Sequence, residues 1–206
     1  WTKKRGTPYV PSPLLYDGRL FFTQSNQNLL SCLDAKDGSE IINRERLPGM
    51  SGIYSSPVGA NGLVYVCSGF DRPTLHAIRP TGKGDVTKTH LAWQTSKNAP
   101  HSSSVIVTKG LLFMAADSGV VSCLDAKSGQ LHWKERVSGA CSSSLLLAAG
   151  RIYLVDESGK TFVFAAAPKY KLLAQNDLAD RCLASFAVTE GSFFIRTAKA
   201  VWRIGK

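Results

Sequence analysis

The strongest constraint in this amino-acid sequence is that it repeats itself. LSCLDAKDG at Leu30–Gly38 returns as VSCLDAKSG at Val121–Gly129, 91 residues later. A finer pattern occurs five times, in which a serine is followed six residues later by glycine and nine residues later by an aromatic residue. The five anchoring serines are Ser12, Ser56, Ser104, Ser144 and Ser185. A period of about 40 to 48 residues indicates stacked supersecondary units, as in solenoids or propellers.

Each copy predicts a meander of four antiparallel strands. A short apolar run follows the anchoring serine and ends at a glycine turn such as Asp17-Gly18 or Asn61-Gly62, which is typical of a tight β-hairpin. The second run, for example Leu112-Phe113-Met114, is apolar at every position, so both of its faces should be covered. Since no window shows a sustained helical period, helical solenoids are excluded.

Four-stranded meanders with doubly covered centres are typical of the blades of a β-propeller. We therefore expect one all-β domain over residues 1–206 with five blades. Their approximate ranges are 8–47, 52–97, 101–137, 141–177, and 182–206 together with 1–5.

Tryptophan sets the phase of the blades. Trp1, Trp93 and Trp133 each lie eleven residues before an anchoring serine, which places them on a fourth strand. The last copy has no fourth run of its own, so we expect the N-terminal strand to pair with it and close the ring. The alternative is that the chain is the C-terminal slice of a propeller with seven or eight blades.

Composition agrees with a globular protein. Apolar residues make up 44% of the chain and charged residues 19%, which excludes a disordered tail or a coiled coil. The formal net charge is +10, which favours anionic partners in general. Five cysteines, an odd number without a C-x-x-C pair, support neither a disulfide framework nor a zinc ribbon.

The segments SSPVGANGLVYV, SCLDAKSGQLHW and GRIYLVDESG resemble the quinoprotein-like (PQQ-binding-like) β-propeller repeat family. This family includes a bacterial lipoprotein of outer-membrane protein assembly and the pyrroloquinoline-quinone-dependent dehydrogenases. The resemblance covers nearly the whole chain, and it implies a blade fold and an envelope or periplasmic location. Fold alone does not carry function.

The resemblance does not extend to the family's redox chemistry. Its quinone-dependent enzymes carry an adjacent Cys-Cys pair, and no two cysteines are adjacent here. We therefore expect no catalytic residues, no cofactor and no resident metal, and an enzymatic activity is the weaker hypothesis.

One column of residues suggests a binding site at the mouth of the central channel. The residues three positions before each anchoring serine are Tyr9, Ile53, His101, Cys141 and Cys182. Equivalent positions in a propeller are related by rotation about its axis, so these side chains should converge. Histidine and two cysteines suit zinc or copper, whereas the simpler interpretation is that the column packs the channel mouth.

A second candidate is a basic patch. If the ring closes, Lys3, Lys4 and Arg5 lie beside Arg203 and Lys206. Such a patch fits an anionic polymer, lipid head groups or an acidic protein. Nucleic acid is not expected, because stacking aromatics are not interleaved with these charges.

The sequence thus favours a non-catalytic propeller scaffold that binds a protein partner in a bacterial cell envelope. Two alternatives remain open. One is a quinone- or metal-dependent redox enzyme that uses the channel mouth, and the other is a carbohydrate- or polyanion-binding propeller.

Overall fold

The computed structural model consists of β-strands joined by turns. It describes residues 1–2, 10–24, 29–46, 53–69 and 72–205. In these ranges there are twenty strands in five sheets, and no helix is present. None of the described segments is therefore an apolar helix of membrane-spanning length.

Each sheet is one blade, and its strands follow one another antiparallel in chain order. The first blade contains β1 (Leu14–Tyr16), β2 (Arg19–Gln24), β3 (Leu29–Asp34) and β4 (Glu40–Arg46). The second contains β5 (Val58–Ala60), β6 (Leu63–Ser68), β7 (Thr74–Ile78) and β9 (Leu91–Thr95). The third contains β10 (Ile106–Thr108), β11 (Leu111–Ala115), β12 (Val120–Asp125) and β13 (Leu131–Arg136). The fourth contains β14 (Leu146–Ala148), β15 (Arg151–Val155), β16 (Lys160–Ala165) and β17 (Leu172–Asp177). The fifth contains β18 (Ala187–Thr189), β19 (Ser192–Arg196) and β20 (Val201–Ile204).

The predicted hairpins between first and second strands are confirmed. Both central residues of each turn have positive φ, as at Asn61 (53°) and Gly62 (75°). This is the primed turn whose twist matches that of the flanking strands. The remaining pairs are Asp17-Gly18, Lys109-Gly110, Ala149-Gly150 and Glu190-Gly191.

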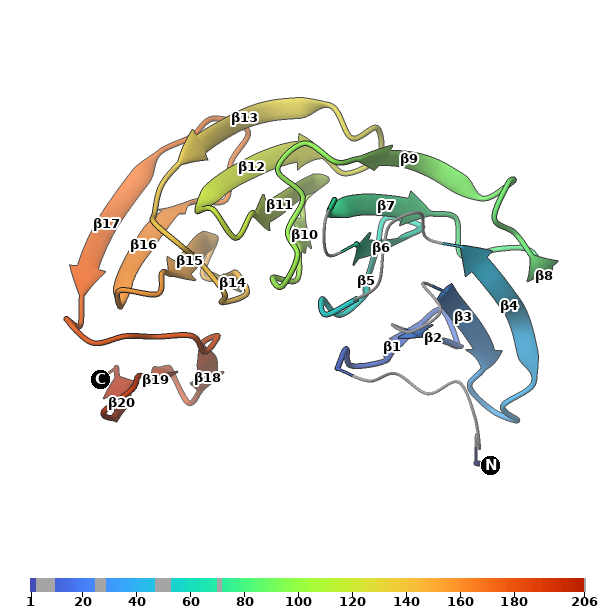
Figure 1. Cartoon of the computed structure of the whole chain (residues 1–206), viewed down its shortest axis with the longest axis horizontal. Helices are drawn as coiled ribbons and strands as arrows, with labels where there is room; N and C mark the ends of the chain where they lie inside the picture. The colour runs from blue at the N-terminus through green and yellow to red at the C-terminus, as the bar shows by residue number, and fades with distance from the viewer. Residues whose placement is uncertain (3–9, 25–28, 47–52, 70–71, 206) are drawn as a thin grey trace.

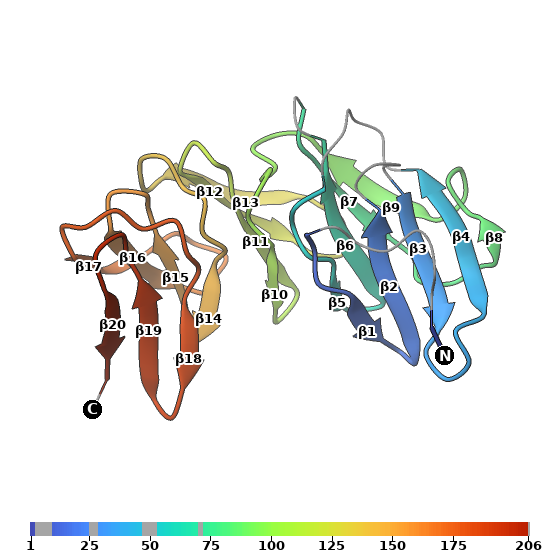
Figure 2. The same ribbon diagram turned by 60° about the horizontal axis from the view of Figure 1, so that its bottom comes forward.

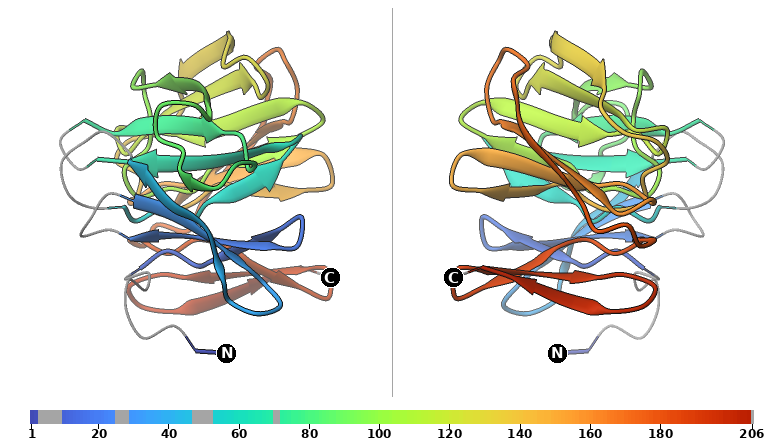
Figure 3. Two further views of the ribbon diagram at one scale, coloured as in Figure 1. Left: turned by 90° about the vertical axis from the view of Figure 1, so that its right-hand side faces the viewer. Right: turned by 90° about the vertical axis from the view of Figure 1, so that its left-hand side faces the viewer.

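The blades stand side by side around an arc, with the short first strands inside and the fourth strands outside (Figure 1). Figure 2 shows the same blades tilted, with the last blade at one end and the first blade at the other. Figure 3 looks at the arc from its two sides, with β4 in front in one view and β17 in front in the other. The fold is thus the expected all-β propeller architecture.

The second strands form the core, because their side chains alternate between two blade interfaces. Phe113, in β11, is fully buried and lies in one cluster with Ile152 of the fourth blade, whereas its neighbour Leu112 packs with Tyr65 of the second blade. The predicted burial holds for Phe21, Tyr65 and Phe113, but Tyr153 and Phe194 are only half-buried. These two side chains belong to the end of the arc, where fewer blades cover them.

Tryptophans on fourth strands donate hydrogen bonds to the neighbouring blade. The indole nitrogen of Trp93 donates to Ala126 O at 3.1 Å, and that of Trp133 donates to Ala167 O at 3.0 Å. Trp1 repeats this contact on the first blade, donating to Ala35 O at 3.3 Å while its ring covers Gly38. The fourth-strand position predicted from tryptophan is therefore correct for Trp93 and Trp133, whereas Trp1 lies in none of the described strands.

The predicted closure of the ring is not formed by the described residues. The sheet of the last blade ends at β20, which pairs with β19 and has no fourth strand. The arc is open between the last blade and the N-terminus, which lies against the first blade (Figure 1). Each blade is rotated from its neighbour by an amount that buried side chains on both faces dictate, and five such steps do not complete a circle. Residues 3–5 of the predicted closing strand lie outside the described residues.

An insertion protects the outer edge of the first blade. Residues 79–90, between β7 and β9, leave the second blade and place β8 (Gly84–Asp85) parallel to β4. The guanidinium of Arg19 donates to the carbonyl of Pro80 in the same segment. Covering an edge strand in this way limits pairing with other chains, and Gly82 and Gly84 supply the positive φ values of this segment.

A buried histidine lies in the second blade. His76, in β7, is 1% exposed, and its Nε2 is 2.8 Å from the hydroxyl of Ser68. Burial lowers the pKa of His76 to about 4, partly offset by a hydrogen bond with Gln94. The residue is therefore neutral in the folded protein at neutral pH.

Replacing Phe113 with alanine should lower the free energy of unfolding by roughly 3–5 kcal/mol, because a fully buried aromatic ring leaves a cavity. Phe194→Ala should cost less than half as much, since Phe194 is half-exposed. Chemical denaturation followed by tryptophan fluorescence measures both. Equal losses would mean that the last blade is packed as tightly as the middle blade.

His76 should make the fold sensitive to acid. In the unfolded chain the imidazole takes up a proton near pH 6.5, whereas in the fold it does so only near pH 4. The unfolded state thus binds more protons between these values, so stability is complete above about pH 6.5 and falls by roughly 2–3 kcal/mol as the pH drops to 4. His76→Gln should flatten this part of the stability curve, measured by urea unfolding at each pH, and an unchanged slope would contradict the assignment.

Candidate functional site

The candidate site is the mouth of the arc, formed where the chain enters each blade. We define the mouth rim by the entry loops at residues 100–104, 140–144 and 181–185 and the facing turns at 116–119, 156–159 and 197–200. Backbone hydrogen bonds join the second and third of these loops to their turns, from Glu157 N to Ala140 O at 2.9 Å and from Ala198 N to Arg181 O at 2.8 Å.

The two cysteines of the predicted column belong to separate interfaces. Cys141 is 1% exposed, and its thiol donates to Val155 O in its own blade at 3.7 Å. Cys182 is equally buried, and its thiol donates to Arg196 O at 3.3 Å. Burial raises the pKa of both thiols. Both therefore behave as small packing residues with a satisfied S–H group.

The other members of the column differ from one another. Ile53 is fully buried in the cluster shared by the first two blades. His101 is partly exposed, with its Nδ1 3.6 Å from an oxygen of Asp117 and its ring against Tyr54, at a centroid distance of 4.9 Å. Tyr9 lies outside the described residues.

The structure does not bring the column together as a metal site. Among the described residues, no group of three or more histidine, cysteine, aspartate or glutamate side chains is arranged to hold a metal ion. All five cysteines are buried, and none of them forms a disulfide. A binding role for the column stays a prediction.

Acidic residues of the turns organise the rim instead. Asp117 accepts hydrogen bonds from the backbone N–H groups of His101 (3.1 Å) and Ser102 (3.4 Å). Glu157 takes the equivalent place in the next blade and accepts from the hydroxyl of Ser142. These carboxylates fix the entry loops, so they are already engaged within the fold.

The rim also joins neighbouring blades through the main chain. Cys141 N donates to Asp117 O of the preceding blade at 2.9 Å, and Cys182 N donates to Glu157 O at 3.2 Å. Each entry loop is therefore seated on the turn of the blade before it.

The anchoring serines form a ladder that the sequence pattern alone did not explain. The backbone N–H of each serine donates to the hydroxyl oxygen of the serine in the following blade. The four bonds are Ser12 to Ser56 (3.0 Å), Ser56 to Ser104 (3.0 Å), Ser104 to Ser144 (3.0 Å) and Ser144 to Ser185 (2.8 Å). A serine recurs here because the position needs a hydroxyl acceptor as well as a small side chain.

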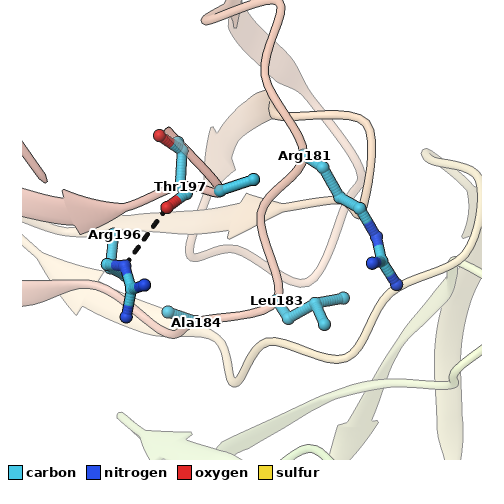
Figure 4. Close-up of a pocket in the computed structure, with 6 residues that line it drawn as sticks. Arg181, Leu183, Ala184, Arg196 and Thr197 are labelled. Carbon is cyan, nitrogen blue, oxygen red and sulfur yellow. Dashed lines mark hydrogen bonds between the residues drawn. The ribbon is translucent and has the colours of Figure 1, made fainter. Parts of the chain in front are cut away.

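A hollow of about 430 Å³ opens on the mouth rim of the last blade. Two arginines, Arg181 and Arg196, flank it, and Leu183 lies between them (Figure 4). The remaining lining residues are Ala184, Thr197 and Ala198. Sequence reasoning missed this feature, although arginine at residue 196 stands out once the blades are aligned.

The predicted basic patch is only partly described. Arg203 is exposed on β20, where its Nε donates to the hydroxyl of Ser192 at 3.2 Å. Lys3, Lys4, Arg5 and Lys206 lie outside the described residues. The patch as a whole stays a prediction.

Comparison with known proteins agrees with the resemblance seen in the repeats. A family model described as "Outer membrane protein assembly factor BamB" matches residues 82–171. The proteins of that name from Yersinia pestis and Escherichia coli K12 are each 29% identical over 94 and 90 residues, which is 46% and 44% of this chain. The matched segments amount to 23% and 22% of those relatives, so the chain spans under a quarter of their length.

Solved structures confirm the architecture. BamB from Moraxella catarrhalis superimposes with a TM-score of 0.73 at 13% identity, covering 99% of this chain and 62% of that protein. The computationally designed Ika8 protein gives a TM-score of 0.74 at 11% identity, covering 94% and 57%. At these identities the likeness concerns the fold. The chain thus carries quinoprotein-like propeller repeats and is similar to BamB.

Removing one hydroxyl from the serine ladder should loosen two adjacent blades. Ser144→Ala leaves the N–H of Ser104 without its acceptor, and we expect a loss of roughly 1–3 kcal/mol in unfolding free energy. Ser118→Ala, at an exposed turn of the third blade, is the matched control and should stay within about 0.5 kcal/mol. Urea unfolding compares the two variants. Equal losses of unfolding free energy would mean that the ladder does not stabilise the fold.

Proposed function

We propose that this chain is a non-catalytic β-propeller scaffold that binds a protein partner during outer-membrane protein assembly in a bacterial cell envelope. The observation that carries the proposal is the match of residues 82–171 to an outer-membrane protein assembly factor family. That segment includes the whole of the third blade and most of the fourth, so it covers part of the mouth rim.

The hydrogen bonds within the mouth rim support a scaffold role. Its serines, carboxylates and thiols are engaged in hydrogen bonds that hold loops and blades together. Burial raises the pKa of the thiols of Cys141 and Cys182, which disfavours the nucleophilic or metal-binding thiolate. What the described rim offers to solvent is a fixed set of loops, which suits recognition of a protein surface.

A periplasmic location fits the same comparison, because the relatives are named as factors of outer-membrane assembly. The alternative of a polyanion-binding propeller rests on the net charge of +10 and on the basic patch. No arrangement among the described residues favours the redox alternative.

A segment exchange tests the proposal. Residues 82–171 replace the matched segment of the Escherichia coli K12 assembly factor, in cells that lack the original gene. We expect the chimera to restore outer-membrane protein levels, measured by immunoblot, to at least half of the normal amount. A version of that factor without the segment is the control.

Accumulation of the chimera at normal levels in the periplasm without any recovery of outer-membrane proteins would contradict the proposal. If the chimera fails to accumulate, a second chimera that carries only the third blade of this chain, residues 101–137, is tested in the same way.

A further inference from the structure

The ends of the third and fourth blades that lie opposite the mouth rim are strongly basic. We define the turn face of these blades by residues 109–111, 125–130, 149–151 and 165–171, which form the turns at that end. The turn face carries one carboxylate and five exposed cations: Asp125 on the one hand, and Lys109, Lys127, Arg151, Lys169 and Lys171 on the other. Both blades lie within the arc, with a neighbouring blade on each side (Figure 1).

Backbone hydrogen bonds hold the turns of the turn face at one level. Ala126 N donates to Gly110 O at 2.8 Å, and the fourth blade repeats this bond at 3.1 Å. The indole nitrogen of Trp133 donates to Ala167 O at 3.0 Å, which joins the two blades at this end. The five cations therefore stand on one preformed surface.

The carboxylate of Asp125 is used within its own turn. Its Oδ1 accepts a hydrogen bond from the backbone N–H of Ser128 and another from the hydroxyl of Ser128, each at 2.7 Å. Among the described residues, none of the five cations forms a salt bridge. The positive charge of the turn face is therefore presented to solvent.

The mouth rim of the same two blades carries the opposite charge. Its loops at 100–104 and 140–144 and its turns at 116–119 and 156–159 contain three carboxylates and no lysine or arginine. The carboxylates are those of Asp117, Asp156 and Glu157. These blades are thus polarised along the axis of the arc, and a negatively charged surface would attract the turn face and repel the rim.

Exposed leucines lie beside the cations. Leu131 begins β13 directly after the turn of Lys127 and is 50% exposed, and Leu172 begins β17 directly after Lys171 and is 44% exposed. The two leucines take equivalent places in the registers of their blades. Lysines next to protruding apolar side chains are typical of surfaces that enter the head-group region of an anionic bilayer.

The insertion of the second blade extends the positive charge. Residues 79–90 contain a single carboxylate, Asp85, and three exposed cations, Arg79, Lys83 and Lys88. Arg79 directly follows β7, at the same end of its blade as the turn face. The basic surface thus runs across three blades, which is broader than the groove or single strand edge that a peptide occupies.

The chemistry of the turn face favours lipid over an acidic protein. Four of its five cations are lysines. Their compact charges on flexible stems do not impose the paired geometry with which arginine binds carboxylates. Lipid head groups are mobile and adjust to such charges, and each cation near an anionic bilayer strengthens binding by about fivefold. The leucines gain from a bilayer and not from a hydrated acidic chain.

We propose that the turn face, together with Leu131 and Leu172, binds the surface of a bilayer that contains anionic phospholipids. In this orientation the mouth rim is directed away from the bilayer, where a protein partner can reach it. The inference goes beyond the proposed function, because lipid contact uses the opposite end of the blades from the rim.

Cosedimentation of the intact chain with vesicles tests the proposal. One set of vesicles is phosphatidylcholine alone, and the other contains about 30% phosphatidylglycerol. At low salt, we expect the chain to partition onto the anionic vesicles roughly tenfold more strongly, or more. Because salt screens surface charge, raising its concentration to about 0.5 M should remove most of this difference.

Variants of the turn face should weaken this binding. Lys109→Gln with Lys127→Gln and Arg151→Gln should reduce partitioning onto anionic vesicles roughly tenfold or more, since each cation contributes about fivefold. Leu131→Gln should reduce it about threefold, because a polar side chain gains less from the bilayer interface. If the triple variant does not fold, as judged by thermal unfolding, Lys127→Gln alone should still reduce partitioning about fivefold.

The matched control removes the same amount of charge from exposed positions outside the turn face, by Arg72→Gln with Lys97→Gln and Lys134→Gln. It should change partitioning by about twofold at most, because charges far from the bilayer are screened.

Equal partitioning onto the two kinds of vesicle, equal losses in the triple variant and its control, or unchanged partitioning of Leu131→Gln would overturn the proposal. Binding of a fluorescent polyglutamate peptide without retention on anionic vesicles would assign the turn face to an acidic protein and overturn it as well. The segment exchange measures recovery of outer-membrane proteins, so its result and that of the vesicle assay are read separately.

Discussion

The serine ladder on the inner strands is the interaction on which the rest of the arc depends. Ser56, Ser104 and Ser144 each donate through the backbone and accept through the hydroxyl, and the bonds run from Ser12 to Ser185 without a break. Each of these bonds satisfies a backbone N–H group at the inner side of a blade. The ladder therefore sets the distance between neighbouring inner strands, and the large side chains outside it fill the space that remains.

Two further kinds of contact join neighbouring blades farther from the axis. Aromatic residues of the second strands pack between blades, and tryptophans of the outer strands donate to carbonyls of the next blade, as Trp93 does to Ala126. The second blade is therefore joined to the third, and the third to the fourth, at three distances from the axis. These contacts restrict the conformations of the mouth rim. A rim that is preformed in this way suits docking of a partner.

The last blade differs from the other four in how its aromatic position is covered. Phe194 keeps the aromatic position of the repeat, but no blade covers it among the described residues, and arginines replace the small residues on either side of it.

The sequence by itself determined the repeat, the four-stranded blades, the turns and the phase of the tryptophans, because these depend on short-range spacing that every copy restates. It also placed Cys141 and Cys182 at equivalent positions of successive blades. Only the tertiary structure decided where those thiols point, because each bonds to a carbonyl of its own blade instead of reaching toward the axis. The sequence left open whether five blades close into a ring or form part of a larger propeller. Only the tertiary structure showed an open arc over the described residues, because the placement of one blade against the next results from packing between whole strands, which no local pattern records.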